Sequence, residues 1–204
     1  MPTTAENLSS PAEPLARRAR LLLKSLPIAA PFLEGWPDLR ATRIIQSHRL
    51  PVCALLSDIE KGAVPATAAL VEALVVATDA LEWRQTYTAA EFGQAFLNNY
   101  GWTELIGLRG PIASTEVACG FLALGPQTEY PAHAHEAEEL YLPLAGAALW
   151  MRGREDFVAR LPGAAIEHPS WMPHAMRTQR DPLLAFYVWR GGDLAAKSKI
   201  IRNE

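Results

Sequence analysis

Hydrophobic positions in the first half of the chain recur at the three- and four-residue spacing of amphipathic helices. Leucines fall at this spacing in residues 12–26, and apolar side chains do so again in residues 66–84. Thr88 and Glu91 stand three residues apart, as in a capping box, which predicts a short helix that ends at Gly101. The N-terminal half is therefore expected to be mainly helical.

The pattern changes near Gly110 and Pro111, and from Glu116 onward short apolar runs alternate with glycine and proline. Five runs predict strands: Val117–Leu124, Glu139–Leu144, Ala147–Arg152, Ala164–Glu167 and Leu183–Trp189. Short strands at close spacing are typical of a β-sandwich or barrel. We therefore expect a mainly β protein, with an N-terminal helical region over 1–110 packed on a β domain over 111–204.

The composition is that of an ordinary folded protein, since 50% of the 204 residues are hydrophobic and 20% are charged. A net charge of −3 gives no basic footprint, so we expect no nucleic-acid partner. No run approaches the roughly 20 apolar residues that span a bilayer, so we expect no membrane partner. Cys53 and Cys119 form no C-x-x-C pair, which favours buried free thiols and a cytoplasmic location.

Four of the five histidines fall between residues 133 and 174. On an extended strand His133 and His135 project from the same face; Glu139 follows after three residues, and His174 supplies a distant fourth ligand. Three imidazoles and a carboxylate suit one divalent Zn, Fe, Mn, Ni or Co ion, and ligand type does not choose among these metals. A lone histidine is more often a structural or surface residue, but the grouping favours a metal site.

Two motifs with fixed spacing surround these ligands. The first comprises Gly125, His133, His135, Glu139 and Gly146, and the second comprises Gly163, Pro169, Trp171 and His174. Both resemble the motifs of the cupin superfamily, although Trp171 replaces the customary glycine and Thr178 stands where asparagine is common. The resemblance implies that residues 111–204 form a small cupin barrel, a double-stranded β-helix or jelly roll, preceded by several α-helices.

The sequence around the motifs resembles that of a narrower family, the dimethylsulfoniopropionate (DMSP) lyases of marine bacteria. The similar segments are residues 130–135, 138–141, 146–150, 168–178 and 182–191. The resemblance implies a metal-dependent carbon–sulfur lyase that converts a small zwitterionic substrate, DMSP, to dimethyl sulfide and acrylate by β-elimination. The resemblance extends over roughly residues 60–195, with its specific motifs in 125–190.

The same resemblance implies that Tyr141 removes a proton from the carbon next to the substrate carboxylate. Strand alternation independently places Tyr141 on the face of Glu139. The alternative for Tyr141 is a barrel side chain whose hydroxyl only finds a hydrogen-bond partner. Tyr130 matches a second tyrosine of the lyase site, which would orient the substrate or aid proton transfer, and an ordinary strand-end aromatic is its alternative.

Tyr187 and Trp189 alternate with apolar residues on the last strand and share one face. Facing inward, their rings would bind the sulfonium of the substrate by cation–π attraction, whereas core packing is the alternative. His168 lies outside the ligand pattern and is interpreted as a residue that supports the ligands or the fold.

Two other functions are compatible with these residues. One is a different small-cupin metalloenzyme, such as an isomerase or an iron-dependent dioxygenase, and the other is a non-catalytic ligand-binding cupin. The sequence does not set the oligomeric state, and a homodimer is one arrangement that it allows.

Overall fold

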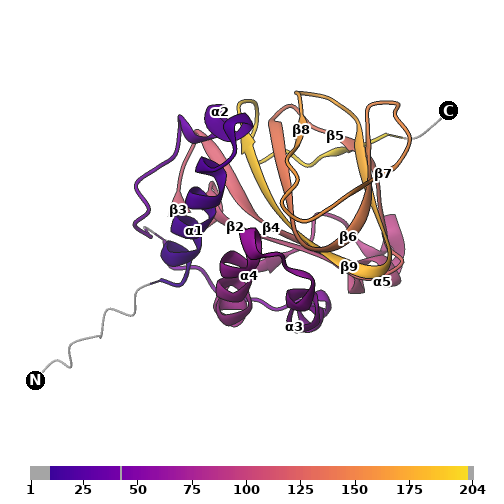
Figure 1. Ribbon diagram of the computed structural model, residues 1–204, viewed down its shortest axis with the longest axis horizontal. Coiled ribbons are helices and arrows are strands. Elements are labelled where there is room, and N and C mark those ends of the chain that lie inside the picture. Colours follow the sequence, from indigo (N-terminus) through magenta and orange to yellow (C-terminus); the bar gives the residue numbers. More distant parts are fainter. Residues whose placement is uncertain (1–9, 42, 202–204) are drawn as a thin grey trace, which may run out of the picture.

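The computed structural model describes residues 10–41 and 43–201. Helices α1 to α4 lie together against one face of a curled sheet, with the barrel-like half of the sheet beyond them (Figure 1). The α-helices are α1 (Ala12–Lys24), α2 (Ala30–Leu33), α3 (Leu56–Ile59), α4 (Pro65–Ala77) and α5 (Ala89–Asn98). Single 3₁₀ turns occupy Pro27–Ala29, Pro51–Leu55, Glu60–Gly62 and Thr78–Ala80.

The two helices predicted from spacing both form, with one error of length. Helix α1 agrees with the prediction and buries Leu15, Ala19 and Leu23 on one face. The helix predicted over 66–84 is too long, because α4 ends at Ala77 and strand β1 (Trp83–Arg84) follows. The fully buried indole of Trp83 and the pairing of β1 with the sheet override the helical spacing there.

The capping-box prediction is confirmed, since the Thr88 amide donates to Glu91 Oε2 at 2.8 Å at the start of α5. The predicted role of Gly101 is wrong. The helix ends at Asn98, and Gly101 lies inside strand β2 (Tyr100–Gly107). A Cβ at Gly101 would stand 2.9 Å from the side chain of Leu50, so the glycine permits close packing against the sheet.

The remaining strands form one curled sheet. They are β3 (Ile112–Ala113), β4 (Val117–Leu124), β5 (Glu129–Ala134), β6 (Glu138–Arg152), β7 (Val158–Arg160), β8 (Ile166–His168), β9 (His174–Arg190) and β10 (Lys199–Ile200). The order is β1-β2-β4-β9-β5-β10, with β6 joining β9 to β7 and β8 and with β3 beside β2. Strand β9 pairs with β5 through its first half and with β4 through its second, and β6 pairs along both halves, which curls the sheet.

The predicted fold class, strands in a cupin-type curled sheet preceded by helices, is confirmed. Strand β4 has the predicted bounds, but the two strands predicted over 139–152 are one strand, β6, with register shifts at Pro143/Ala145 and Gly146/Ala148. Strands β1 and β2 come from before residue 110 and pair into the same sheet, and the division at that residue stays a prediction. None of the described helices is long and apolar enough to cross a membrane.

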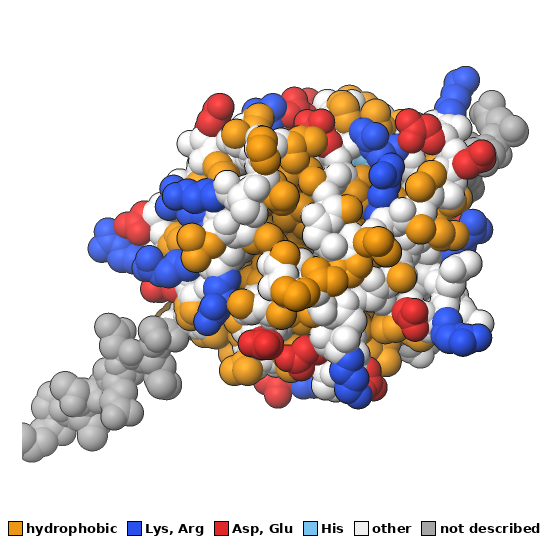
Figure 2. Space-filling view, in the orientation of Figure 1, with side chains coloured by type: hydrophobic (Ala, Val, Ile, Leu, Met, Phe, Trp, Pro, Cys, Tyr) orange, Lys and Arg blue, Asp and Glu red, His pale blue; other side chains and the backbone are white. Residues whose placement is uncertain are grey.

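Successive side chains of a strand point alternately to the two faces of the sheet, and each face has its own hydrophobic cluster. Phe121 of β4 and Phe186 of β9 pack edge to face, 5.4 Å between ring centroids, in the cluster that holds the N-terminal helices. Leu122 and Tyr187, the next residues along, belong to a second cluster on the inner face. On the face of the molecule seen in Figure 2, acidic and basic side chains are interspersed around hydrophobic ones. The inner face is the one that carries polar chemistry.

Candidate metal centre

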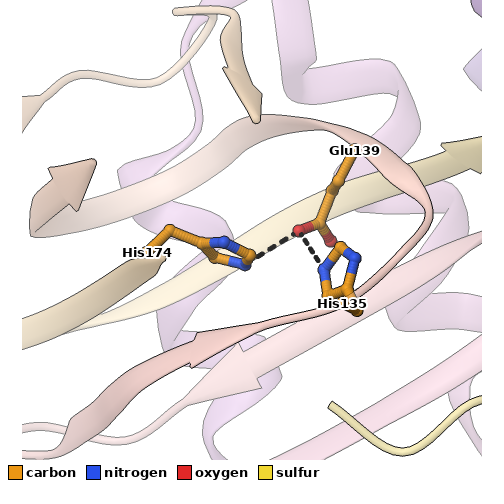
Figure 3. Close-up of side chains that lie close together, drawn as sticks. All are labelled: His135, Glu139 and His174. Atoms are coloured by element: carbon orange, nitrogen blue, oxygen red, sulfur yellow. Dashed lines mark hydrogen bonds and ion pairs between the residues drawn. The ribbon is translucent and has the colours of Figure 1, made fainter. Parts of the chain in front are cut away.

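Three potential ligand residues converge on the inner face of the sheet. His135, Glu139 and His174 each offer a donor atom, and these atoms all lie within 4.8 Å of one another (Figure 3). Nε2 of His135 and Nε2 of His174 are each 3.1 Å from Oε2 of Glu139. All three residues are buried. We call them the donor group.

Sheet register explains how residues distant in sequence meet. Glu139 is the second residue of β6 and lies opposite Trp189 of β9, and His174 begins β9 opposite His133 of β5. His135 follows directly after β5, in the short turn that leads to β6. The ends of three strands therefore meet at one point.

Hydrogen bonds fix the protonation of the two imidazoles in the donor group. Nδ1 of His135 lies 2.8 Å from the Ala137 carbonyl, and Nδ1 of His174 lies 2.9 Å from the Met172 carbonyl. A carbonyl only accepts, so both Nδ1 atoms carry hydrogens and each neutral ring presents an Nε2 lone pair to Glu139. Nε2 of His174 has no hydrogen-bond partner among the described residues. When both rings are neutral, two lone pairs face a carboxylate, so a cation must lie between them; a divalent metal ion fits these donors, and a proton on Nε2 is the alternative when no metal is bound.

The charges in the donor group favour an ionised carboxylate. Burial alone would raise the pKa of Glu139, but the charge and hydrogen bond of His135, together with the neighbouring rings of His168 and His174, hold this pKa well below its usual value. Burial would lower the pKa of His135, and Glu139 overcomes it to raise that pKa. In the absence of a metal, a proton on His135 would thus balance Glu139.

His133, the fourth predicted ligand, lies beside the donor group and is not part of it. Its ring centroid is 4.1 Å from that of His174, and its ring stacks on Tyr130 at 4.0 Å. Burial and the neighbouring His174 place the pKa of His133 well below its usual value. Its role as a ligand stays a prediction.

His168 contacts the donor group more closely than its place outside the motif indicated. Its ring stacks on His174 at 4.1 Å, and its Nδ1 lies 3.8 Å from Oε2 of Glu139. Neither ring nitrogen has a hydrogen-bond partner in the described part of the chain. Burial lowers the pKa of His168 to about 4, so the ring is neutral near pH 7.

A pocket of about 290 Å³ opens beside Glu139 and His133. The four aromatic residues predicted from the sequence, Tyr130, Tyr141, Tyr187 and Trp189, all line it. Burial raises the pKa values of Tyr130, Tyr141 and Tyr187 well above the usual value, so in the absence of a bound cation these phenols are neutral. The pocket thus brings Glu139 of the donor group together with hydroxyl groups and aromatic faces.

Other residues that line this pocket were missed by the sequence reasoning. Tyr100, Trp102 and Glu104 reach it from β2, and residues 194–198 cover part of it from the C-terminal end. A period-two alternation of Tyr100, Trp102 and Glu104 with their neighbours was the signal available in the sequence. It was obscured because the preceding helix was extended to Gly101.

A curled antiparallel sheet with a buried His/Glu/His group on its inner face defines a cupin-class protein whose donor group could hold a metal ion. Residues 38–185 match the family model of DMSP lyases. The chain belongs to this family.

Individual relatives agree with the family match. The chain is 34% identical over 164 residues to dimethylsulfoniopropionate lyase DddQ of Ruegeria pomeroyi, covering 79% of this chain and 82% of that protein. A chain from the crystal structures of the DMSP lyases RdDddP and RnDddQII superposes with a TM-score of 0.86 at 34% identity, covering 94% of this chain and 98% of that chain. The crystal structure of DddQ from R. pomeroyi superposes with a TM-score of 0.84 at 31% identity, covering 93% of this chain and 95% of that chain.

Proposed function

We propose that this protein cleaves DMSP to dimethyl sulfide and acrylate. Membership of the DMSP lyase family supports this reaction. The observation that carries it is a single pocket lined by Glu139 of the donor group, by Tyr141 and by further aromatic side chains. A zwitterion fits this pocket, because its carboxylate can bind at the donor group and its sulfonium can lie against the aromatic side chains.

His135, Glu139 and His174 would hold a divalent ion, with His133 proposed as a fourth ligand from its motif position. Such an ion would supply positive charge that binds the substrate carboxylate and stabilises negative charge on the adjacent carbon. Zn, Fe, Mn, Ni and Co all accept nitrogen and carboxylate ligands, so the donor set does not select one of them.

Tyr141 is proposed as the base. Its phenolate oxygen takes the proton from the carbon next to the carboxylate, and the C–H electron pair becomes the new carbon–carbon double bond. The C–S bond breaks with its electron pair on sulfur, so neutral dimethyl sulfide leaves and acrylate remains. Tyr141 lies 6.4 Å from His174 between ring centroids and shares a row of the sheet with Tyr187.

The other predicted residues have supporting roles. Tyr130 stacks on His133, and its hydroxyl lies 3.1 Å from that of Tyr87, which supports a role in orienting the substrate or relaying a proton. Tyr187 and Trp189 present aromatic faces to the pocket, where cation–π attraction to a sulfonium is worth about 0.5–2 kcal/mol.

The test is release of dimethyl sulfide into the headspace above purified protein loaded separately with each of the five metals. Release that depends on added metal is expected. No release from DMSP with any of them would refute the proposal, and binding of DMSP without release would indicate a non-catalytic cupin. Tyr141→Phe should abolish release and keep the metal stoichiometry, because it removes the base and leaves the donor group intact.

A further inference from the structure

The pocket contains a second buried carboxylate that the proposed reaction does not use. Glu104 lies on β2, lines the pocket and is 5% exposed. A buried carboxylate is costly unless hydrogen bonds or a cation stabilise it. The hydrogen bonds and charges around Glu104 therefore indicate its role.

Hydrogen bonds satisfy only one of its two oxygens. The backbone N–H groups of Arg109 and Gly110 donate to Oε1 at 2.6 and 2.7 Å. Within the described part of the chain these are the hydrogen bonds of the carboxylate, and Oε2 is left for a ligand. Burial raises the pKa of Glu104, and the two N–H groups partly offset this by favouring the charged form.

The cationic side chains around the pocket are bound to other partners. The guanidinium of Arg84 bonds Glu82 at 2.6 Å, and that of Arg109 bonds the Ala195 carbonyl at 2.7 Å. Lys197 pairs with Glu91 of α5. In the described part of the chain none of these three forms an ion pair with Glu104; the charges of Arg109 and Arg84 act on it only from a distance and favour its charged form.

The sheet places this charge in line with the aromatic wall. Glu104 pairs with Gly120, Gly120 with Tyr187, and Tyr187 with Tyr141, so the four residues form one row across β2, β4, β9 and β6. Gly120 carries no side chain to separate Glu104 from Tyr187. A Cβ there would stand 1.8 Å from the Thr103 carbonyl oxygen, so the close strand packing itself requires glycine.

We propose that Glu104 is the counter-charge that recognises the cationic end of the substrate, and that it makes the pocket selective for onium carboxylates over neutral-tailed acids. The carboxylate end of such a ligand would lie at the donor group on the β6 side, and the onium end between Glu104 and the ring of Tyr187. A buried carboxylate beside an aromatic face attracts a cation through both charge and quadrupole. The substrate class rests on the proposed function of the site.

The structural alternative is that Glu104 only braces the loop after β2 through Arg109 and Gly110. Glu104→Gln separates the two roles, because the amide oxygen can still accept both N–H groups while the charge is lost. Glu104→Asp keeps the charge. Glu116→Gln is the matched control, since it removes the same charge from an exposed position outside the pocket.

The experiment measures binding, by calorimetry on metal-loaded protein, of two probes of the same shape. 3-(Trimethylammonio)propionate carries a cationic nitrogen where 4,4-dimethylpentanoate has a neutral carbon. We expect the wild type to prefer the cationic probe by about tenfold or more, and Glu104→Gln to lose most of that preference, while binding the neutral probe as before. Glu104→Asp should restore part of the preference, and Glu116→Gln should leave it unchanged.

An unchanged preference in folded Glu104→Gln would overturn the inference, as would equal affinity of the wild type for both probes, a result that needs no variant. Circular dichroism and the thermal midpoint establish that each variant is folded. The outcome is independent of turnover. A preference that depends on Glu104 without any release of dimethyl sulfide would refute the lyase activity and support the inference. Release of dimethyl sulfide with no preference that depends on Glu104 would support the lyase activity and refute the inference.

Discussion

The indole N–H of Trp189 donates a hydrogen bond of 2.6 Å to Oε1 of Glu139, the carboxylate of the donor group. The same indole lies over the ring of His135, with 4.1 Å between ring centroids. Trp189 therefore touches two of the three donor residues, in addition to its place in the pocket wall. Its hydrogen bond orients Glu139 so that Oε2 faces the two imidazoles.

Trp189→Phe should weaken metal binding by about 10- to 100-fold, because the hydrogen bond that orients a ligating carboxylate is lost while a smaller aromatic ring is kept. Titration with a metal indicator measures the affinity. Trp171→Phe is the control, since Trp171 is exposed and does not line the pocket. An affinity equal to the wild type would show that Trp189 serves substrate contact alone.

Removal of the metal should lower thermal stability. An ion that binds only the folded protein contributes about 2.7 kcal/mol when its concentration is 100 times its dissociation constant. A chelator should therefore lower the thermal midpoint of the wild type. His135→Ala, which removes one donor, should show little response to the chelator. Equal responses in the two proteins would contradict the assignment of the donor group.

Two members of the donor group, His135 and Glu139, could be placed together from the sequence because they are only four residues apart. The end of β5, the turn after it and the start of β6 carry His133, His135 and Glu139 within seven residues, which keeps these residues close together. The contacts of Trp189 and His168 with Glu139 could not be predicted, because they depend on the pairing of β9 and β8 with β6. The alternation around Glu104 was a local signal, but its place in the pocket depends on pairing too, since two strands lie between it and Tyr141.

The fold shows a similar division between local and distant information. Helix α1 and strand β4 have strong local periodicity, and both were predicted nearly to the residue. Strand β1 has only two residues, and its state is decided by pairing with β2 rather than by its own pattern. The join of two predicted strands into β6 likewise depends on Gly146, whose φ of +80° lets the strand bend without breaking.

Gly120→Ala should destabilise the protein by about 3 kcal/mol or more, because the added Cβ would overlap the Thr103 carbonyl and push β2 away from β4. Gly153→Ala tests backbone strain without a clash, since Gly153 has a φ of +60° and open space around it. It should cost only about 1 kcal/mol. Denaturant unfolding measures both, and similar losses in the two variants would contradict the packing argument.

The thiol of Cys119 should resist alkylation in the folded protein. Burial places its pKa well above the usual value, so little thiolate is present at neutral pH, and the side chain is also closed to reagents. Mass spectrometry after iodoacetamide treatment should find Cys119 unmodified in buffer and modified in denaturant. Rapid modification under native conditions would show that β4 opens.

Tyr87 and Tyr130 should act as one unit. Their hydroxyl groups are 3.1 Å apart, both side chains are buried, and their ring centroids are 5.9 Å apart. If Tyr130 positions the substrate or a proton through this hydrogen bond, then Tyr87→Phe should reduce kcat/KM for DMSP although Tyr87 does not line the pocket. The loss expected for one hydrogen bond, about 1 kcal/mol, corresponds to roughly fivefold.

A double-mutant cycle tests this coupling. When two residues work through one shared bond, the double variant Tyr87→Phe/Tyr130→Phe should lose no more than Tyr130→Phe alone, because the bond is already absent in the single variant. Metal stoichiometry should be the same in all three, since neither hydroxyl belongs to the donor group. Fully additive losses would mean that the two tyrosines act separately, and the positioning role of Tyr130 would then have to come from its stack on His133.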